Sequence, residues 1–113
     1  MVFNTGAALL DAIVLAVVSK EQEGTYGYKI TQDVRTVIDI SESTLYPVLR
    51  RLQKEECLEV YDMAIDGRNR RYYKITEKGS AQLRLYREEW GTYSTKISKI
   101  LSEVKYEQER VFG

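Results

Sequence analysis

The stretch SESTLYPVLRRLQKEECLEVYDMAIDGRNRRYYKITEKG, residues 41–79, decides the fold, because its hydrophobic period changes halfway along. Its first half, residues 42–56, follows a capping Ser41 and has an apolar residue every three or four positions, which predicts an amphipathic helix. Those residues are Leu45, Val48, Leu49 and Leu52. Residues 58–65 and 70–75 are instead rich in β-branched and aromatic side chains, and 66–69 are polar. This predicts a β-hairpin with a turn about four residues long.

Helical patterns lie on both sides of this stretch. Residues 6–21 are apolar on most of a helical circumference, and 27–38 have inward positions at Ile30, Val34 and Val37/Ile38. Residues 27–38 and 42–56 with their tight polar connection match a helix-turn-helix. After a capping Thr76, apolar residues alternate in steps of three and four, which is typical of a dimerisation helix. They are Leu83, Tyr86, Trp90, Tyr93, Ile97, Ile100 and Val104.

These elements predict a mainly α fold with a small two-stranded β-wing, in the α+β class. We expect a winged helix-turn-helix over residues 1–78 and a C-terminal dimerisation helix over 79–113, together forming one compact unit. The dimer contacts are expected at five of the heptad positions, namely Leu83, Trp90, Ile97, Ile100 and Val104.

Composition excludes several functions. The 113 residues carry 17 Lys+Arg and 17 Asp+Glu, so the chain is not a generally basic nucleic-acid coat protein. It has no histidine and one cysteine, Cys57, which excludes Ser-His and Cys-His dyads and zinc sites built on imidazole. We therefore expect no enzyme, metal or cofactor. The apolar run over 7–18 is too short to span a bilayer, and a lone cysteine suits a reducing compartment. These features predict a cytoplasmic protein without a membrane partner.

The helix over 42–56 has a second face, opposite its leucines. Ser43, Pro47, Arg50 and Lys54 recur there, with Thr44, Tyr46 and Arg51 alongside. Small hydroxyls followed by cations are what a DNA-recognition helix needs. A merely solvated face is the alternative, since two glutamates follow. If Ser41 is the cap, Pro47 lies past the first turn and should bend the helix; a start near Ser43 would accommodate it.

The hairpin carries four cations within seven residues and no acid between them: Arg68, Arg70, Arg71 and Lys74. Such a wing can lie along a phosphate backbone or reach the minor groove of DNA. The alternative is a charged edge that prevents strand-to-strand aggregation. We expect the neighbouring Tyr72 and Tyr73 to pack within the wing rather than stack on bases.

The last helix has aromatic residues at the centre of its heptads, Tyr86, Trp90 and Tyr93, with Gly91 between them. Large flat rings are poor knobs for tight two-stranded packing. They either pack on the first helix within a dimer core, or they line a cavity for a flat apolar ligand.

Three motifs resemble the PadR family of bacterial transcriptional regulators: TYGYKI (25–30), SESTLYPVLRRLQKEECLEVY (41–61) and GRNRRYYKITEKG (67–79). The resemblance covers about residues 10–80, and the short C-terminal part is similar to the multidrug-binding subgroup. It implies a homodimeric winged-helix repressor that binds a palindromic operator in double-stranded DNA. The residues implied to contact DNA are Tyr28, Lys29, Ser43, Thr44, Tyr46, Pro47, Arg50, Arg68, Arg70 and Arg71.

The same resemblance implies that a small planar hydrophobic ligand stacks on Trp90 at the dimer centre and relieves repression. Other lining positions implied are Ala12, Ala16, Leu83 and Tyr86, to which the aromatic pattern adds Tyr93. The chain departs from the family pattern at Cys57, where a glycine is usual, and at Tyr86, which is bulky enough to fill the cavity. A winged-helix protein-interaction module that binds neither DNA nor ligand is the rival hypothesis.

Overall fold

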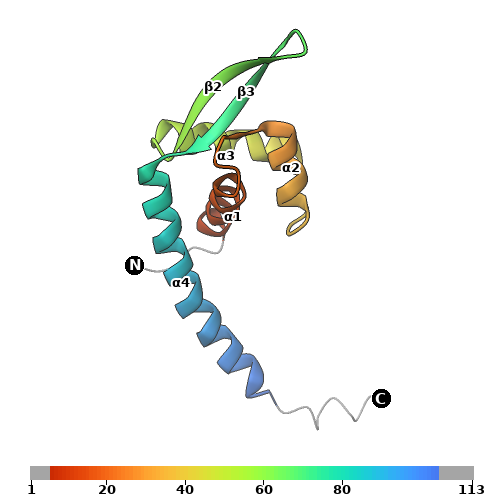
Figure 1. Cartoon of the computed structure of the whole chain (residues 1–113). Helices are drawn as coiled ribbons and strands as arrows, with labels where there is room; N and C mark the ends of the chain where they lie inside the picture. The colour runs from red at the N-terminus through yellow and green to blue at the C-terminus, as the bar shows by residue number, and fades with distance from the viewer. Residues whose placement is uncertain (1–5, 105–113) are drawn as a thin grey trace, which may run out of the picture.

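The computed structural model describes residues 6–104, which form four helices and three strands (Figure 1). In chain order these are α1 (Ala7–Ser19), β1 (Thr25–Tyr26), α2 (Gly27–Arg35), α3 (Glu42–Lys54), β2 (Leu58–Ile65), β3 (Arg68–Ile75) and α4 (Glu77–Ser102). The predicted mainly helical winged fold with a long last helix is thus confirmed. The domain boundary predicted at residue 78 stays a prediction, and residues 105–113 of its second part lie outside the described residues.

The core forms where α1, α2 and α3 meet the base of the hairpin. Its largest fully buried side chains include Leu15 of α1, Ile30 of α2, and Leu45, Leu49 and Leu52 of α3. These are the positions that the helical spacing selects, so each helix turns its apolar face inward.

Helix α2 is shorter than predicted, and the assignment of Val37 and Ile38 to its inner face is wrong. The Thr36 hydroxyl and backbone N–H both donate to the Asp33 carbonyl, at 2.7 and 3.2 Å, and this closes the helix at Arg35. Val37 and Ile38 are 68% and 38% exposed. Ile40, beyond the turn, reaches the core instead.

Helix α3 also ends two residues earlier than predicted. The Cys57 N–H donates to the Leu52 carbonyl and the Glu56 N–H to the Gln53 carbonyl, both at 2.9 Å, which is a Schellman motif. Glu56 occupies the left-handed position of this motif, with φ of 65°. A glutamate therefore stands where glycine is favoured, at a cost in conformational energy.

The wing is a three-stranded antiparallel sheet, not the predicted two-stranded hairpin. Thr25 and Tyr26 of β1 pair with Tyr73 and Tyr72, so the strand order is β1-β3-β2. The predicted four-residue turn is also wrong, because Ile65 pairs with Arg68 and only two residues connect the strands. Asp66 and Gly67 both have positive φ, 52° and 76°, as a type I′ turn requires.

Tyr72 packs within the wing, as predicted, whereas Tyr73 reaches beyond the wing into the core. Tyr73 is 5% exposed and belongs to the core. The Tyr72 ring lies between those of Tyr26 and Tyr61, 5.7 Å from each.

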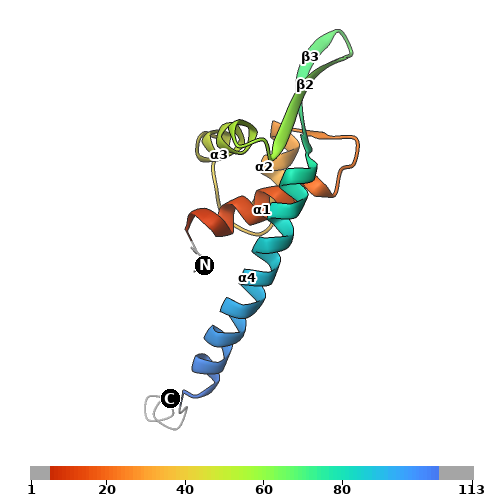
Figure 2. The same cartoon turned by 90° about the vertical axis from the view of Figure 1, so that its left-hand side faces the viewer.

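Helix α4 starts against the base of the wing and then leaves the core. The Thr76 hydroxyl accepts from the Gly79 N–H at 2.9 Å and donates to the Glu56 carbonyl at 2.6 Å. A Cβ on Gly79 would lie 2.1 Å from the Cys57 carbonyl oxygen, so only glycine fits there. The first half of α4 packs beside α1. Its second half and the hairpin project from opposite ends of the core (Figures 1 and 2).

Candidate DNA interface and apolar groove

Helix α3 presents the face expected of a recognition helix. Its N-cap is Ser41, whose hydroxyl accepts from the Thr44 N–H at 3.3 Å and contacts the Ser43 and Thr44 hydroxyls at 3.0 Å. Pro47 is therefore the sixth residue of the helix, past the first turn, and the later start near Ser43 is wrong. The predicted outward residues are exposed, except for the half-buried Tyr46 and Arg51. The exposed ones are Ser43, Thr44, Pro47, Arg50 and Lys54.

A cleft of about 560 Å³ lies where α3, the start of α2 and the wing meet. Five predicted DNA-contacting residues line it, namely Tyr28, Tyr46, Arg50, Arg70 and Arg71, and sequence reasoning missed Tyr26, Gly27 and Tyr73. Its lining contains three arginines and no carboxylate. A concave surface of this kind attracts phosphate groups.

Aromatic rings pack against other residues that line this cleft. The Arg70 guanidinium lies 4.7 Å from the centre of the Tyr26 ring, which is a cation–π contact. A Cβ on Gly27 would lie 2.7 Å from the Tyr46 hydroxyl, so this glycine lets the tyrosine ring approach α2 closely. The Arg71 Nε lies 3.9 Å from an Asp62 carboxylate oxygen across the hairpin. Burial raises the pKa of Tyr73 above its usual value, so that phenol stays protonated.

Three further cations predicted to contact DNA do not line the cleft. The Lys29 ammonium lies 2.9 Å from Asp33 and 3.2 Å from Glu21, and hydrogen bonds to these carboxylates raise its pKa. Arg68 adjoins the two-residue turn at the tip of the wing, and Lys54 ends α3. Their part in DNA binding stays a prediction.

A second hollow of about 670 Å³ lies between α1 and α4, and we call it the groove. It brings together Ala12, Ala16, Leu83, Tyr86 and Trp90, five of the six predicted ligand residues. Tyr93 is not in its lining, although the Tyr93 and Trp90 ring centres are 6.1 Å apart. Val37 and Ile38 form a further wall that sequence reasoning missed, because it placed them in the core. Tyr86, which is bulky enough to fill the cavity, lines the groove instead and leaves its volume of about 670 Å³ open.

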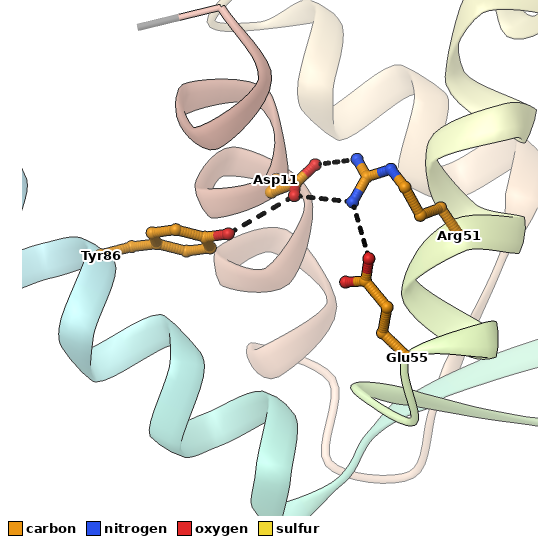
Figure 3. A network of polar contacts seen from close by, with 4 residues as sticks. All are labelled: Asp11, Arg51, Glu55 and Tyr86. Carbon is orange, nitrogen blue, oxygen red and sulfur yellow. Dashed lines mark hydrogen bonds and ion pairs between the residues drawn. The ribbon is translucent and has the colours of Figure 1, made fainter. Parts of the chain in front are cut away.

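An ion-pair network joins α1, α3 and α4 (Figure 3). Arg51, predicted to lie alongside Arg50 on the outward face of α3, turns inward instead and makes a two-pronged contact with the carboxylate of Asp11 on α1. Its Nη1 lies 2.9 Å from Oδ2, and its Nη2 contacts Oδ1. Tyr86 donates to the same Oδ2 at 3.5 Å, and Glu55 lies 3.6 Å from Arg51 Nη1. The outward placement of Arg51 is therefore wrong, because Asp11 lies 40 positions away and helical spacing does not reveal it.

Two protonation states follow from this network. The hydrogen bond to Asp11 raises the pKa of Arg51, so its charge is permanent. Burial, and then the negative charge of Asp11, raise the pKa of the Tyr86 phenol. Tyr86 thus remains a hydrogen-bond donor to Asp11 throughout the physiological range.

The predicted dimer residues divide into two groups. Leu83 is half-buried, and Trp90 is 43% exposed in the groove. Ile97, Ile100 and Val104 lie beyond the core, where they are exposed together with Leu101. Within residues 6–104, no three acidic or sulfur side chains gather as a metal site would require. None of the helices in this range combines the length and the apolarity needed to cross a bilayer.

A helix-turn-helix, a wing and an arginine-lined cleft between them define a winged-helix DNA-binding protein. The model of the transcriptional regulator PadR-like family matches residues 14–85. The chain belongs to this family, so it is a DNA-binding transcriptional regulator and not an enzyme, as predicted.

Several individual proteins and solved structures are similar to this chain. The crystal structure of smu.1704 from Streptococcus mutans is 36% identical with a TM-score of 0.80, and the match covers 93% of this chain and 98% of that one. A PadR-like transcriptional regulator from Bacillus cereus is 33% identical with a TM-score of 0.76, covering 86% and 94%. The transcriptional regulator Rv3488 from Mycobacterium tuberculosis is 39% identical over 51% of this chain and 55% of its own length.

Proposed function

We propose that this regulator is a homodimeric repressor that holds a palindromic operator. The observation that carries the proposal is the cleft beside α3, whose lining has three arginines and no carboxylate. The outward face of α3 would enter the major groove, and the cleft would receive the adjacent phosphates. In a dimer the two copies of α3 would meet half-sites roughly 34–36 Å apart.

The apolar residues of α4 support the dimer. Ile97, Ile100 and Leu101 expose between 39% and 63% of their surface on the half of α4 that projects from the core. Val104, predicted as a heptad position of the helix, lies two residues past its end at Ser102 and is 46% exposed. Packing this half against a second copy would remove these side chains from water. Sedimentation should show a dimer at micromolar concentration, and a folded monomer would contradict this part of the proposal.

The groove supports a planar hydrophobic ligand that relieves repression. Its walls are mostly aliphatic and aromatic, and Trp90 offers a flat surface for stacking. A ligand that binds one dimer geometry better than another would shift the spacing of the two α3 helices. Because Trp90 is the only tryptophan, its fluorescence reports directly on the groove. Planar aromatic compounds should quench it, and a panel that leaves it unchanged would refute ligand binding.

Gel-shift titrations with the DNA upstream of the protein's own gene test the central claim. We expect binding that weakens steeply with salt and exceeds binding to random DNA of equal length. The rival, a protein-interaction module, would bind both DNAs equally weakly at every salt concentration.

A further inference from the structure

Three helices converge on one buried carboxylate. The Asp11 side chain on α1 is 6% exposed, and it is held by Arg51 from α3 and by the Tyr86 hydroxyl from α4 (Figure 3). A buried carboxylate needs its hydrogen-bond donors because water is not there to replace them. The positions of α3 and α4 relative to α1 are therefore both tied to this one group.

One of the two donors lines the groove, and the other, which lines neither hollow, directly follows a residue of the cleft. Tyr86 lines the groove and lies one helical turn before Trp90 on α4. Arg51 follows Arg50, which lines the cleft on the other side of α3. Asp11 itself lines neither hollow.

We propose that Asp11 is a positioning residue that couples the groove to the recognition helix. A molecule that seats in the groove and moves the Tyr86 ring removes one donor from the carboxylate. Asp11 then adjusts toward Arg51, its remaining partner, and α3 shifts with the arginine. Glu55, on the same helix as Arg51, lies 3.6 Å from its guanidinium and is an alternative ion-pair partner for it. This inference rests on the proposed function, since it describes how the ligand site acts on the DNA-binding face.

The first experiment needs neither DNA nor ligand. Arg51→Met keeps the aliphatic stem and removes the charge, and we expect a shifted Trp90 emission with altered quenching by iodide, because Asp11 then adjusts toward Tyr86, its remaining partner, and α4 moves with the tyrosine. Arg51→Lys, which keeps one charged donor, should give an intermediate shift. Arg84→Met is the matched control, since Arg84 is exposed on α4 and much nearer to Trp90 along the chain. Circular dichroism verifies that each variant is folded. Unchanged Trp90 emission in Arg51→Met, or an equal shift in Arg84→Met, overturns the coupling.

The second experiment runs in the opposite direction. Tyr86→Phe keeps the ring in the groove and removes only the hydroxyl, so this variant should fold even if Arg51→Met does not. We expect its operator affinity to fall about fivefold, the lower end of typical allosteric couplings, although Tyr86 is remote from the cleft. In an Arg51→Met background the same substitution should change the affinity less than about twofold. An equal decrease in both backgrounds would mean that Tyr86 acts by another route.

The two proposals fail separately. If the wild-type protein does not bind its upstream DNA while Trp90 responds to Arg51→Met, the repressor proposal fails and the coupling stands. If DNA binding is as proposed and Trp90 does not respond, the coupling alone is wrong.

Discussion

Replacing both Arg70 and Arg71 by alanine removes two of the three arginines that line the cleft. In the proposed dimer this amounts to four cations, and removing one cation from a phosphate lowers the slope of log affinity against log salt by about 0.9. If all four cations bind phosphates, the magnitude of this negative slope decreases by about 3.6. Between 50 and 200 mM salt, the affinity of the wild-type protein should therefore decrease about 150-fold more than that of the variant.

Fluorescence anisotropy with labelled operator DNA at several salt concentrations measures these slopes. The matched control is Arg35→Ala/Arg84→Ala, which removes the same charge from exposed positions outside the cleft. Its slope should equal that of the wild type. If the wing variant keeps the wild-type slope, or if the slope of the control falls as much as that of the wing variant, the cleft is not the phosphate-binding surface.

Three further predictions concern stability and reactivity, and chemical denaturation measures the first two. Glu56→Gly should raise the free energy of unfolding by about 1 kcal/mol, because Glu56 occupies a left-handed position that glycine adopts without strain; no gain would mean that the position is not strained. Gly79→Ala should lower the free energy of unfolding by about 2 kcal/mol, because the new Cβ meets the Cys57 carbonyl. Gly91→Ala is the control: a Cβ there meets nothing within 4 Å, and alanine is the better helix former, so the free energy of unfolding should rise by about 1 kcal/mol. Burial raises the pKa of the Cys57 thiol and shields it, so disulfide reagents should react about 100-fold more slowly with the native than with the unfolded chain at pH 8. Equal rates would show that the thiol is accessible.

Local patterns predicted most of the fold. The leucines of α3 and the capping residues Ser41 and Thr76 are signals contained within a few positions, and the structure uses all of them. The short strand β1 could not be predicted this way, because two residues have no period and their pairing with Tyr72 and Tyr73 is distant in sequence. The two-residue turn was missed for a different reason. Asp66-Gly67 is itself a strong turn signal, but the polar Arg68 and Asn69 that follow it extended the predicted loop.

The candidate surfaces divide in the same way. Arg50 and Tyr46 could be assigned to the outward side of α3 from spacing, because the opposite side is filled by leucines. Arg51 could not, because its direction depends on Asp11, a partner 40 positions away. Val37 illustrates the converse error: it continues the period of α2, yet the Thr36 turn ends the helix first and moves the side chain to the groove.

The pairing of β1 with β3 has a consequence for how the wing can be altered. Tyr26 ends β1 and is also the N-cap residue of α2, so the strand that pairs with the root of the hairpin runs directly into that helix. The tip is open, since a Cβ on Gly67 would meet nothing within 4 Å. Lengthening both strands by two residues at the tip would therefore extend the reach of the hairpin along DNA and leave the pairing of its root with β1 unchanged. Lengthening β3 by one residue would instead turn every side chain beyond the insertion onto the opposite side. The length of the hairpin can therefore be changed only by an even number of residues in each strand.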